Sequence, residues 1–155
     1  MDFTVHQVQS KEEKVQIARI ILEKLTDWFG IPEYREQYIK DSAEWEFFRA
    51  DTDDGPKGFL CLKKTGDATV ELAVMGVDPQ YHHMGLGTAL FDSAKARARD
   101  LGFEFIQVKT VKEGMYDDYD ITNAFYRSLG FKEFECFPLY WDEANPCQIY
   151  VMHIS

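Results

Sequence analysis

The sequence predicts a mixed α/β (α+β) fold that forms a single domain over residues 1–155. Two observations carry this prediction. Apolar residues make up 45% of the sequence, which is enough for one core of ordinary size. Segments in which apolar residues occur at every second position, as in strands, also alternate along the sequence with segments in which apolar residues recur at helical spacing. Glycine or proline stands at most of the boundaries between them.

The first part of the sequence predicts a strand, one or two helices and a hairpin. Residues 3–9 alternate like a strand, and residues 11–29 have one apolar face at helical spacing. A glycine and a proline then break the helix, and residues 30–41 are typical of a short helix or an ordered loop. Strands are predicted at 43–52 and 57–65, joined by the hairpin turn sequence DDGP. The apolar face of the helix comprises Ala18, Ile21, Leu22, Leu25 and Trp28.

The second part of the sequence alternates strands with helices. A strand over 68–77 is followed by a helix over 85–101 and by a strand over 103–111. A short helix is predicted over 120–131, with Gly130 as its C-cap. Two further strands complete the order β-α-(α)-β-β-β-α-β-α-β-β, at residues 132–141 and 146–154.

The net charge of -10 and the pI of about 4.8 describe an acidic protein. An acidic surface repels nucleic acid and anionic membranes, so neither is expected as a partner. It attracts amine-bearing ligands, although solubility alone explains such a charge more simply. No apolar run has the length of a membrane span, and the first residues lack the pattern of a signal peptide, which indicates a cytoplasmic protein.

The three cysteines, Cys61, Cys136 and Cys147, are widely spaced and form no CxxC pair. That pattern favours reduced thiols over a disulfide framework. Buried thiols that pack as small apolar groups are the simpler interpretation. A catalytic cysteine is the alternative.

The stretch YHHMGLGTALF, at residues 81–91, places two glycines directly before a predicted helix. The first N–H groups of a helix have no partner inside it and carry partial positive charge. Glycine lets the backbone approach an anion closely, so Gly85 and Gly87 predict a pyrophosphate cradle. Leu90 stands where a dinucleotide-binding fingerprint needs its third glycine, and no GK[ST] sequence follows, so neither of those two motifs fits.

His82 and His83 raise the alternative of a metal site. Neighbouring side chains in an extended loop point apart, and no nearby cysteine or carboxylate completes a tetrahedral set. The other two histidines, His6 and His153, stand at opposite ends of the sequence. No bound metal is therefore expected, and both histidines are interpreted as loop residues.

Residues 73–103 resemble the signature region of the GNAT superfamily of N-acetyltransferases, in which a strand, the pattern V-D-P-x-[YFW]-[QR]-x-x-G-x-[GA] and a helix follow one another. The family usually has Gln or Arg where this sequence has His82, a shorter donor that is expected to alter the affinity for the cofactor. The stretch NAFYRSLGF resembles the second hallmark of the family, and the order of elements is similar over nearly the whole chain. The matching residues are Val77, Asp78, Pro79, Tyr81, Gly85 and Gly87 in the first motif, and Asn123, Tyr126, Gly130 and Phe131 in the second.

The resemblance implies a single GNAT-like domain with a mixed, mostly antiparallel sheet of six to seven strands flanked by helices. It also implies an acyl-CoA-dependent N-acetyltransferase that moves the acetyl group of acetyl-CoA to the primary amine of a small molecule by direct attack. Another acyl-CoA as donor and a protein amino group as acceptor are the alternatives. Backbone N–H groups from His83 to Thr88 would hold the pyrophosphate, and the strand that ends at Val77 would hold the pantetheine arm. The residues implied in cofactor binding are Met75, Val77, His82, His83, Met84, Gly85, Leu86, Gly87, Thr88 and Asn123.

Tyr126 and Glu71 are the catalytic residues that the resemblance implies. A family tyrosine at the position of Tyr126 points its hydroxyl at the coenzyme sulfur, and a phenol is a suitable donor to the departing thiolate. A core aromatic ring is the alternative for Tyr126. Glu71 stands where many family members carry a glutamate that takes the amine proton, although strand alternation on a half-buried sheet also predicts an exposed residue there.

The acceptor and the partners are left open by the sequence. Residues 113–120 combine acid with tyrosine, and Trp28, Tyr34 and Tyr38 supply further rings, which suits an amine or polyamine. Solvated loops with ordinary turn residues are the alternative. A homodimer is possible because the family often pairs through its C-terminal strands, with the apolar run at 148–154 as the candidate. The rival function is a non-catalytic acyl-CoA-binding or protein-interaction domain of the same fold.

Overall fold

The computed structural model describes residues 2–155, and the contacts among them form two compact units. Unit 1 contains the residues up to Lys63 together with Ala73–Arg97. Unit 2 contains Lys64–Leu72 and Ala98–Ser155. Strand β4 (Thr69–Val77) passes from one unit to the other, so its first half belongs to unit 2 and its second half to unit 1.

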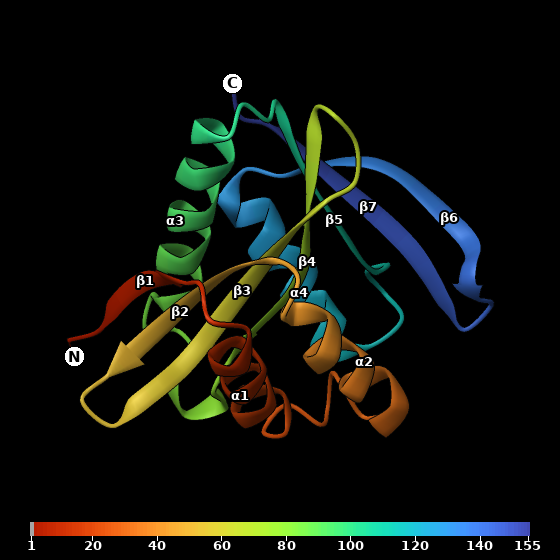
Figure 1. The fold of residues 1–155 in the computed structure, drawn as a ribbon. Coiled ribbons are helices and arrows are strands. Elements are labelled where there is room, and N and C mark those ends of the chain that lie inside the picture. Colours follow the sequence, from red (N-terminus) through yellow and green to blue (C-terminus); the bar gives the residue numbers. More distant parts are fainter. Residues whose placement is uncertain (1) are drawn as a thin grey trace. The chain divides into compact units, whose positions relative to one another are not determined.

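Within residues 2–155, seven strands form one hydrogen-bonded sheet in the order β1-β2-β3-β4-β5-β7-β6 (Figure 1). β4 and β5 are parallel, whereas the pairs β1–β2, β2–β3, β5–β7 and β6–β7 are antiparallel. The predicted α/β class, with a mixed and mostly antiparallel sheet, is therefore confirmed. The other strands are β1 (Thr4–Val8), β2 (Glu46–Thr52), β3 (Gly55–Lys64), β5 (Phe105–Val111), β6 (Lys132–Asp142) and β7 (Asn145–His153). The helices are α1 (Lys11–Leu22), α2 (Pro32–Ser42), α3 (Leu86–Asp100) and α4 (Asp117–Leu129), with a 3₁₀ turn, η1, at Pro79–Tyr81.

Two helices, α1 and α4, differ by several residues from their predicted bounds, and the alternative left open for residues 30–41 is decided. α1 ends at Leu22, and residues 23–29 continue as turns in which the N–H of Leu25 donates to the carbonyl of Leu22 (3.0 Å). Of the two alternatives for residues 30–41, the structure has the helix, and Pro32 begins α2 at a position where its missing N–H costs nothing. α4 begins at Asp117, where acidic side chains complement the positive end of the helix dipole.

In unit 1, α1 and α2 lie side by side and α1 packs against the second half of β4. Gly76 allows this close approach, since a Cβ built there would lie only 2.7 Å from Leu25 Cδ1 and 3.0 Å from Ile21 Cγ2. The backbone of β4 at Gly76 therefore lies directly against the side chains of Ile21 in α1 and of Leu25 just after it. The buried cluster around this contact includes Ile17, Ala18, Leu22, Phe47, Phe59 and Val74.

In unit 2, β7 lies between β5 and β6 and is hydrogen-bonded to both. Figure 1 shows β6 and β7 as a long twisted hairpin. The apolar run at 148–154 is thus largely an interior strand, paired on both sides, and not a free edge for a second copy of the chain. Among the strands described, β6 is the one at this end of the sheet, and its side chains are mostly exposed.

Candidate functional site

Asp78 fixes the turn that follows β4 in unit 1. Its Oδ1 accepts a hydrogen bond from the N–H of Gln80 (3.0 Å), and its Oδ2 accepts one from Nζ of Lys24 (2.8 Å). Burial alone would raise the pKa of the Asp78 carboxyl, but the bonds from Lys24 and Gln80 outweigh burial and lower that pKa. A buried, charged Asp78 thereby sets the direction in which the chain leaves the strand.

His82 is tied back to the end of β4. Its Nε2 lies 2.7 Å from the carbonyl oxygen of Val77, and because a carbonyl only accepts, this nitrogen carries the hydrogen. The imidazole also meets the ring of Trp28 edge to face, with centroids 5.9 Å apart. His82, which stands where the family usually has Gln or Arg, therefore holds the loop to the end of β4.

The loop then turns through two left-handed residues into α3. His83 has φ = 62° and Gly85 has φ = 88°. A left-handed non-glycine residue is uncommon, and histidine is among the residues that tolerate it best. A Cβ at Gly85 would meet no atom within 4 Å, so this glycine is required by its backbone angle and not by space.

The N-terminal end of α3 opens onto this loop. The N–H of Ala89 donates to the carbonyl of Gly85 (3.0 Å), so the amides of residues 86–88 lie in the first turn, where intrahelical acceptors are lacking. Leu86 is 1% exposed and anchors the helix, whereas His83, Met84 and Thr88 are exposed. Helix dipole, first-turn amides and a glycine without side chain together form an anion-binding arrangement.

The strand leading to the loop alternates as predicted. Glu71 and Met75 are half-buried, whereas Leu72 and Val74 on the other face are buried. Val77 is buried as well, and the N–H of the residue after it is bound by the carbonyl of Lys57 (2.7 Å). Of the predicted cofactor-binding residues, unit 1 contains Met75, Val77, His82, His83, Met84, Gly85, Leu86, Gly87 and Thr88.

Glu71 belongs to unit 2 and has a partner that the sequence did not suggest. Nζ of Lys109, on β5, donates to Oε1 of Glu71 at 2.8 Å. Lys109 lies two residues beyond Gln107, which is opposite Glu71 in the parallel pairing, so the two charged side chains share one face. The signal that could have found Lys109 is that it is the one charged residue of β5, but its partner lies 38 positions away in the sequence.

Asn123 is fully buried in unit 2 and its amide is used inside the protein. Nδ2 donates to the carbonyls of Val111 (2.9 Å) and Tyr119 (2.6 Å), and Oδ1 accepts from the hydroxyl of Tyr150 (2.7 Å). The Tyr150 hydroxyl also accepts from Arg127 (3.2 Å). Both amide hydrogens hold α4 to β5 and to its own first turn, and the predicted contact of Asn123 with a cofactor stays a prediction.

Tyr126 lies one helical turn after Asn123 on α4 and is 8% exposed. Its ring has neighbours in Phe125, Phe131 and Tyr150, with centroids 5.8, 5.9 and 6.2 Å away. Val108 directly precedes Lys109 on β5, so the two side chains lie on opposite faces of the sheet. Tyr150 is opposite Val108 and shares its face, so α4 contacts the face opposite to the one that carries Glu71. The ring packs as a core aromatic does, and the role of its hydroxyl stays a prediction.

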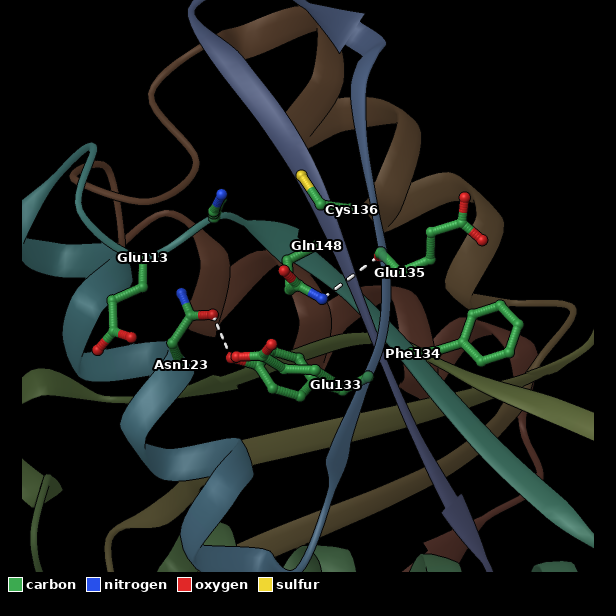
Figure 2. Close-up of a pocket in the computed structure, with 9 residues that line it drawn as sticks. Glu113, Asn123, Glu133, Phe134, Glu135, Cys136 and Gln148 are labelled. Carbon is green, nitrogen blue, oxygen red and sulfur yellow. Dashed lines mark hydrogen bonds between the residues drawn. The ribbon is translucent and has the colours of Figure 1, made fainter.

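Unit 2 also contains a cavity of about 370 Å³ that the sequence did not predict, apart from Asn123 in its wall. Figure 2 shows the carboxylates of Glu113 and Glu135 on opposite sides of it, with Gln148 between them. Nε2 of Gln148 donates to the carbonyl of Glu135 (3.3 Å), so its amide is held by the sheet. The lining residues are Lys112, Glu113, Asn123, Glu133, Phe134, Glu135, Cys136, Gln148 and Tyr150.

The acidic side chains of segment 113–120 mostly take part in contacts that stabilise the fold. Glu113 forms an ion pair with Arg127 (2.9 Å). Asp120 accepts from the N–H of Gly114 (2.7 Å), and the acidic residues of the first turn of α4 complement its dipole. These contacts favour the ordinary structural interpretation of the segment over a polyamine site.

Two of the three cysteines are fully buried. Burial raises the pKa of the Cys61 thiol well above its ordinary value, and it raises that of Cys147 from 9.0 to about 11. Both thiols are therefore protonated at neutral pH. Since the thiolate is the nucleophile, neither residue is suited to covalent catalysis.

The buried Cys147 thiol should make stability depend on pH above 9. Its folded pKa is raised, so its contribution is complete below pH 9 and is lost as pH rises towards 11. We expect the difference in free energy of unfolding between the wild type and Cys147→Ala to shrink by roughly 2 kcal/mol over this window. Denaturant titrations under reducing conditions at pH 8, 9.5 and 11 measure it, with Cys136→Ala, at a half-buried thiol, as the control. A gap that stays constant or widens would contradict the assignment.

Among residues 2–155, no group of three or more His, Cys, Asp or Glu side chains is placed to hold a metal ion. No helix in the described part of the chain is long and apolar enough to cross a membrane.

Comparison with known proteins identifies a family for more than half of the chain. The sequence model of the acetyltransferase (GNAT) domain matches residues 43–133. A search of curated proteins found no match.

Solved structures resemble the fold over almost its whole length. A GNAT-family protein from Desulfovibrio desulfuricans is 20% identical, with a TM-score of 0.86, over 99% of this chain and 100% of that one. The ribosomal-protein-S18-alanine N-acetyltransferase of Escherichia coli is 18% identical, with a TM-score of 0.78, over 99% and 95%. The PaiA N-acetyltransferase of Thermoplasma acidophilum, solved with coenzyme A, is 19% identical, with a TM-score of 0.71, over 96% and 98%. At such identities the likeness is one of fold.

Proposed function

Because the chain belongs to the acetyltransferase (GNAT) domain family, we propose that it transfers an acetyl group from acetyl-CoA to the primary amine of a small molecule. The observation that carries this proposal is the loop at 82–88 of unit 1. There, left-handed His83 and Gly85 lead into the open N-terminal end of α3. Amide N–H groups at the positive end of a helix dipole, with no side chain in the way, suit a pyrophosphate.

The predicted cofactor contacts fit the properties of these residues. Amides from His83 to Thr88 hold the pyrophosphate, and His82 supports them through its bond to Val77 without itself having to reach the phosphate. Backbone groups from Met75 to Val77 receive the pantetheine arm and the developing oxyanion. Asn123 contributes by holding α4, a positioning role that its buried hydrogen bonds support.

Direct transfer requires three proton movements. An ammonium acceptor loses one proton before its nitrogen attacks the thioester carbonyl, and it loses a second as the C–N bond forms and the C–S bond breaks. Glu71 takes the amine protons through water and passes them to solvent, and the Tyr126 hydroxyl protonates the departing thiolate. The products are an N-acetylated amine, CoA and one released proton. Protonated Cys61 and Cys147 thiols support direct attack over an acetyl-cysteine route.

The remaining expectations are part of the same proposal. The net charge of -10 supports an amine acceptor over nucleic acid or membrane, and a cytoplasmic location is proposed with it. A homodimer that pairs through its C-terminal strands uses the edge of β6, because β7 is already paired on both sides.

Calorimetric titration with acetyl-CoA, and with CoA for comparison, tests the cofactor assignment. We expect saturable binding near one per chain. Gly85→Ala should weaken it about tenfold, since a Cβ at φ = 88° costs on the order of 1 kcal/mol and shifts the loop. Gly66→Ala is the matched control, because a Cβ there also meets no atom within 4 Å and the residue lies outside the loop.

The titration separates the possible outcomes. No heat and no competition at millimolar ligand would overturn the cofactor assignment and the enzyme with it. Binding without CoA release from any of a pool of amines would instead support the non-catalytic acyl-CoA-binding domain.

A further inference from the structure

Glu71 and Lys109 present two opposite charges on one face of the unit 2 sheet. They are joined at 2.8 Å, yet neither is sealed from solvent, since the Lys109 side chain is 21% and the Glu71 side chain 14% exposed. Water and small solutes can therefore reach both groups.

Stability alone is a poor explanation for this pair. A partly buried ion pair gains little, because the loss of hydration offsets much of the attraction. Lys109 lies directly opposite Ile149 on β7, so an apolar side chain at position 109 would pack well on a strand. The charges are better explained by a ligand that uses them.

Aromatic side chains of β6 lie beside the pair. Nζ of Lys109 is 5.6 Å from the centroid of the Tyr140 ring, and the Trp141 ring meets Tyr140 nearly at right angles at 6.0 Å. Tyr140 is 57% exposed and Trp141 43% exposed, which is unusual for such large rings. Exposed rings next to a reachable charge pair are typical of a binding surface.

Lys109 restricts the charge of the acceptor. Burial alone would lower the pKa of Lys109, but the hydrogen bond and charge of Glu71 outweigh burial and raise it, so the ammonium stays charged. A polyamine would bring further positive charge next to it and be repelled. A ligand that satisfies both groups carries one ammonium and one carboxylate.

We infer that the acceptor is a free α-amino acid with an apolar side chain, an inference that rests on the proposed function. Lys109 has three N–H donors, so it can keep its bond to Glu71 and also bind the carboxylate of the amino acid. The second oxygen of Glu71 accepts from the amine through a water molecule, and the side chain of the amino acid lies against Tyr140. The amine nitrogen then bonds to the acetyl carbon as the C–S bond breaks, and the products are an N-acetyl amino acid, CoA and one proton.

Matched acceptors test the inference on the unmodified protein. L-phenylalanine is compared with 2-phenylethylamine, and L-leucine with 3-methylbutylamine, because each amine differs from its amino acid only by the carboxylate. Spermidine serves as the polycation. CoA release and the mass of the product are measured at saturating acetyl-CoA. We expect kcat/KM for at least one of the amino acids to exceed that of its amine at least 30-fold, and spermidine to react most slowly.

Variants assign this preference to Lys109. Lys109→Met should reduce the ratio between amino acid and amine to below 3, mainly by raising KM for the amino acid, and should leave acetyl-CoA affinity unchanged. Lys109→Arg should restore most of the preference. Lys132→Met, at an exposed lysine of β6, removes the same charge in the same unit and should leave the ratio as in the wild type.

The outcomes distinguish this inference from the proposed function. Acetyl-CoA binding with equal or faster acetylation of the amines, or acetylation of neither member of either pair, would overturn the amino acid acceptor and leave the transferase standing. Failure to bind acetyl-CoA would overturn the proposed function itself. The wild-type comparison decides between these results even if Lys109→Met does not fold.

Discussion

Tyr126→Phe is expected to lower turnover about 100- to 1,000-fold while acetyl-CoA binds as tightly as before. The change removes the hydroxyl proposed to protonate the departing thiolate and keeps the ring that packs on Phe131 and Tyr150. Initial rates of CoA release at saturating acetyl-CoA measure the effect, and calorimetry measures the affinity. Such a pattern, with kcat reduced and binding intact, identifies a group that acts in the transition state.

A matched variant separates the loss of a particular hydroxyl from the loss of any hydroxyl in this region. Tyr116→Phe removes the hydroxyl that donates to the carbonyl of Ala144 (3.2 Å), directly before α4, and should leave turnover within about twofold. If Tyr126→Phe turned over as fast as the wild type, its ring would be a core aromatic and the acid would have to be sought elsewhere.

Asn123→Ala is expected to lower the free energy of unfolding by about 3 kcal/mol. The change leaves the carbonyls of Val111 and Tyr119 without their donor and removes the acceptor of the Tyr150 hydroxyl, all at a fully buried position. Equilibrium unfolding in urea measures the loss. The exposed hydrogen bond of Asn145 to Asp142 (2.9 Å) provides the control, and Asn145→Ala should cost less than about 1 kcal/mol.

The same variant decides between two roles for Asn123. A large loss of stability with little change in acetyl-CoA affinity per folded molecule supports the positioning role. A stable Asn123→Ala protein that has lost affinity for acetyl-CoA would instead establish the direct cofactor contact and contradict the structural role.

Local features of the fold could be predicted from the sequence because they depend on neighbouring residues. The alternation in β4, the hairpin between β2 and β3 and the glycine-bearing turn into α3 each follow from a short stretch. The pattern does not fix the helix ends, because the apolar face of α1 continues to Leu25 and Trp28 after the helix itself has stopped. Turns can place apolar side chains in a core as well as a helix can.

The partners of residues far apart in the sequence could not be predicted in this way. The position of β7 between β5 and β6 depends on pairing that alternation does not encode. For the same reason the sequence does not distinguish Lys109 from an ordinary strand residue, since its contact with Glu71 exists only in the fold. Asn123 shows the converse, since a motif singled it out but its burial and its three hydrogen bonds appear only in the fold.

The place of β7 between β5 and β6 has a consequence for the protein during its synthesis. The ribosome makes β5 and β6 before β7, yet in the native sheet both strands pair with β7, which lies between them. A nascent chain that stops short of residue 145 thus leaves β6 without its partner and leaves β5 paired only with β4, on one side. β6 is rich in exposed aromatic side chains, and open strand edges are prone to association. Folding of unit 2 is therefore expected to wait for release of this strand from the exit tunnel, and premature termination there should yield an aggregating product.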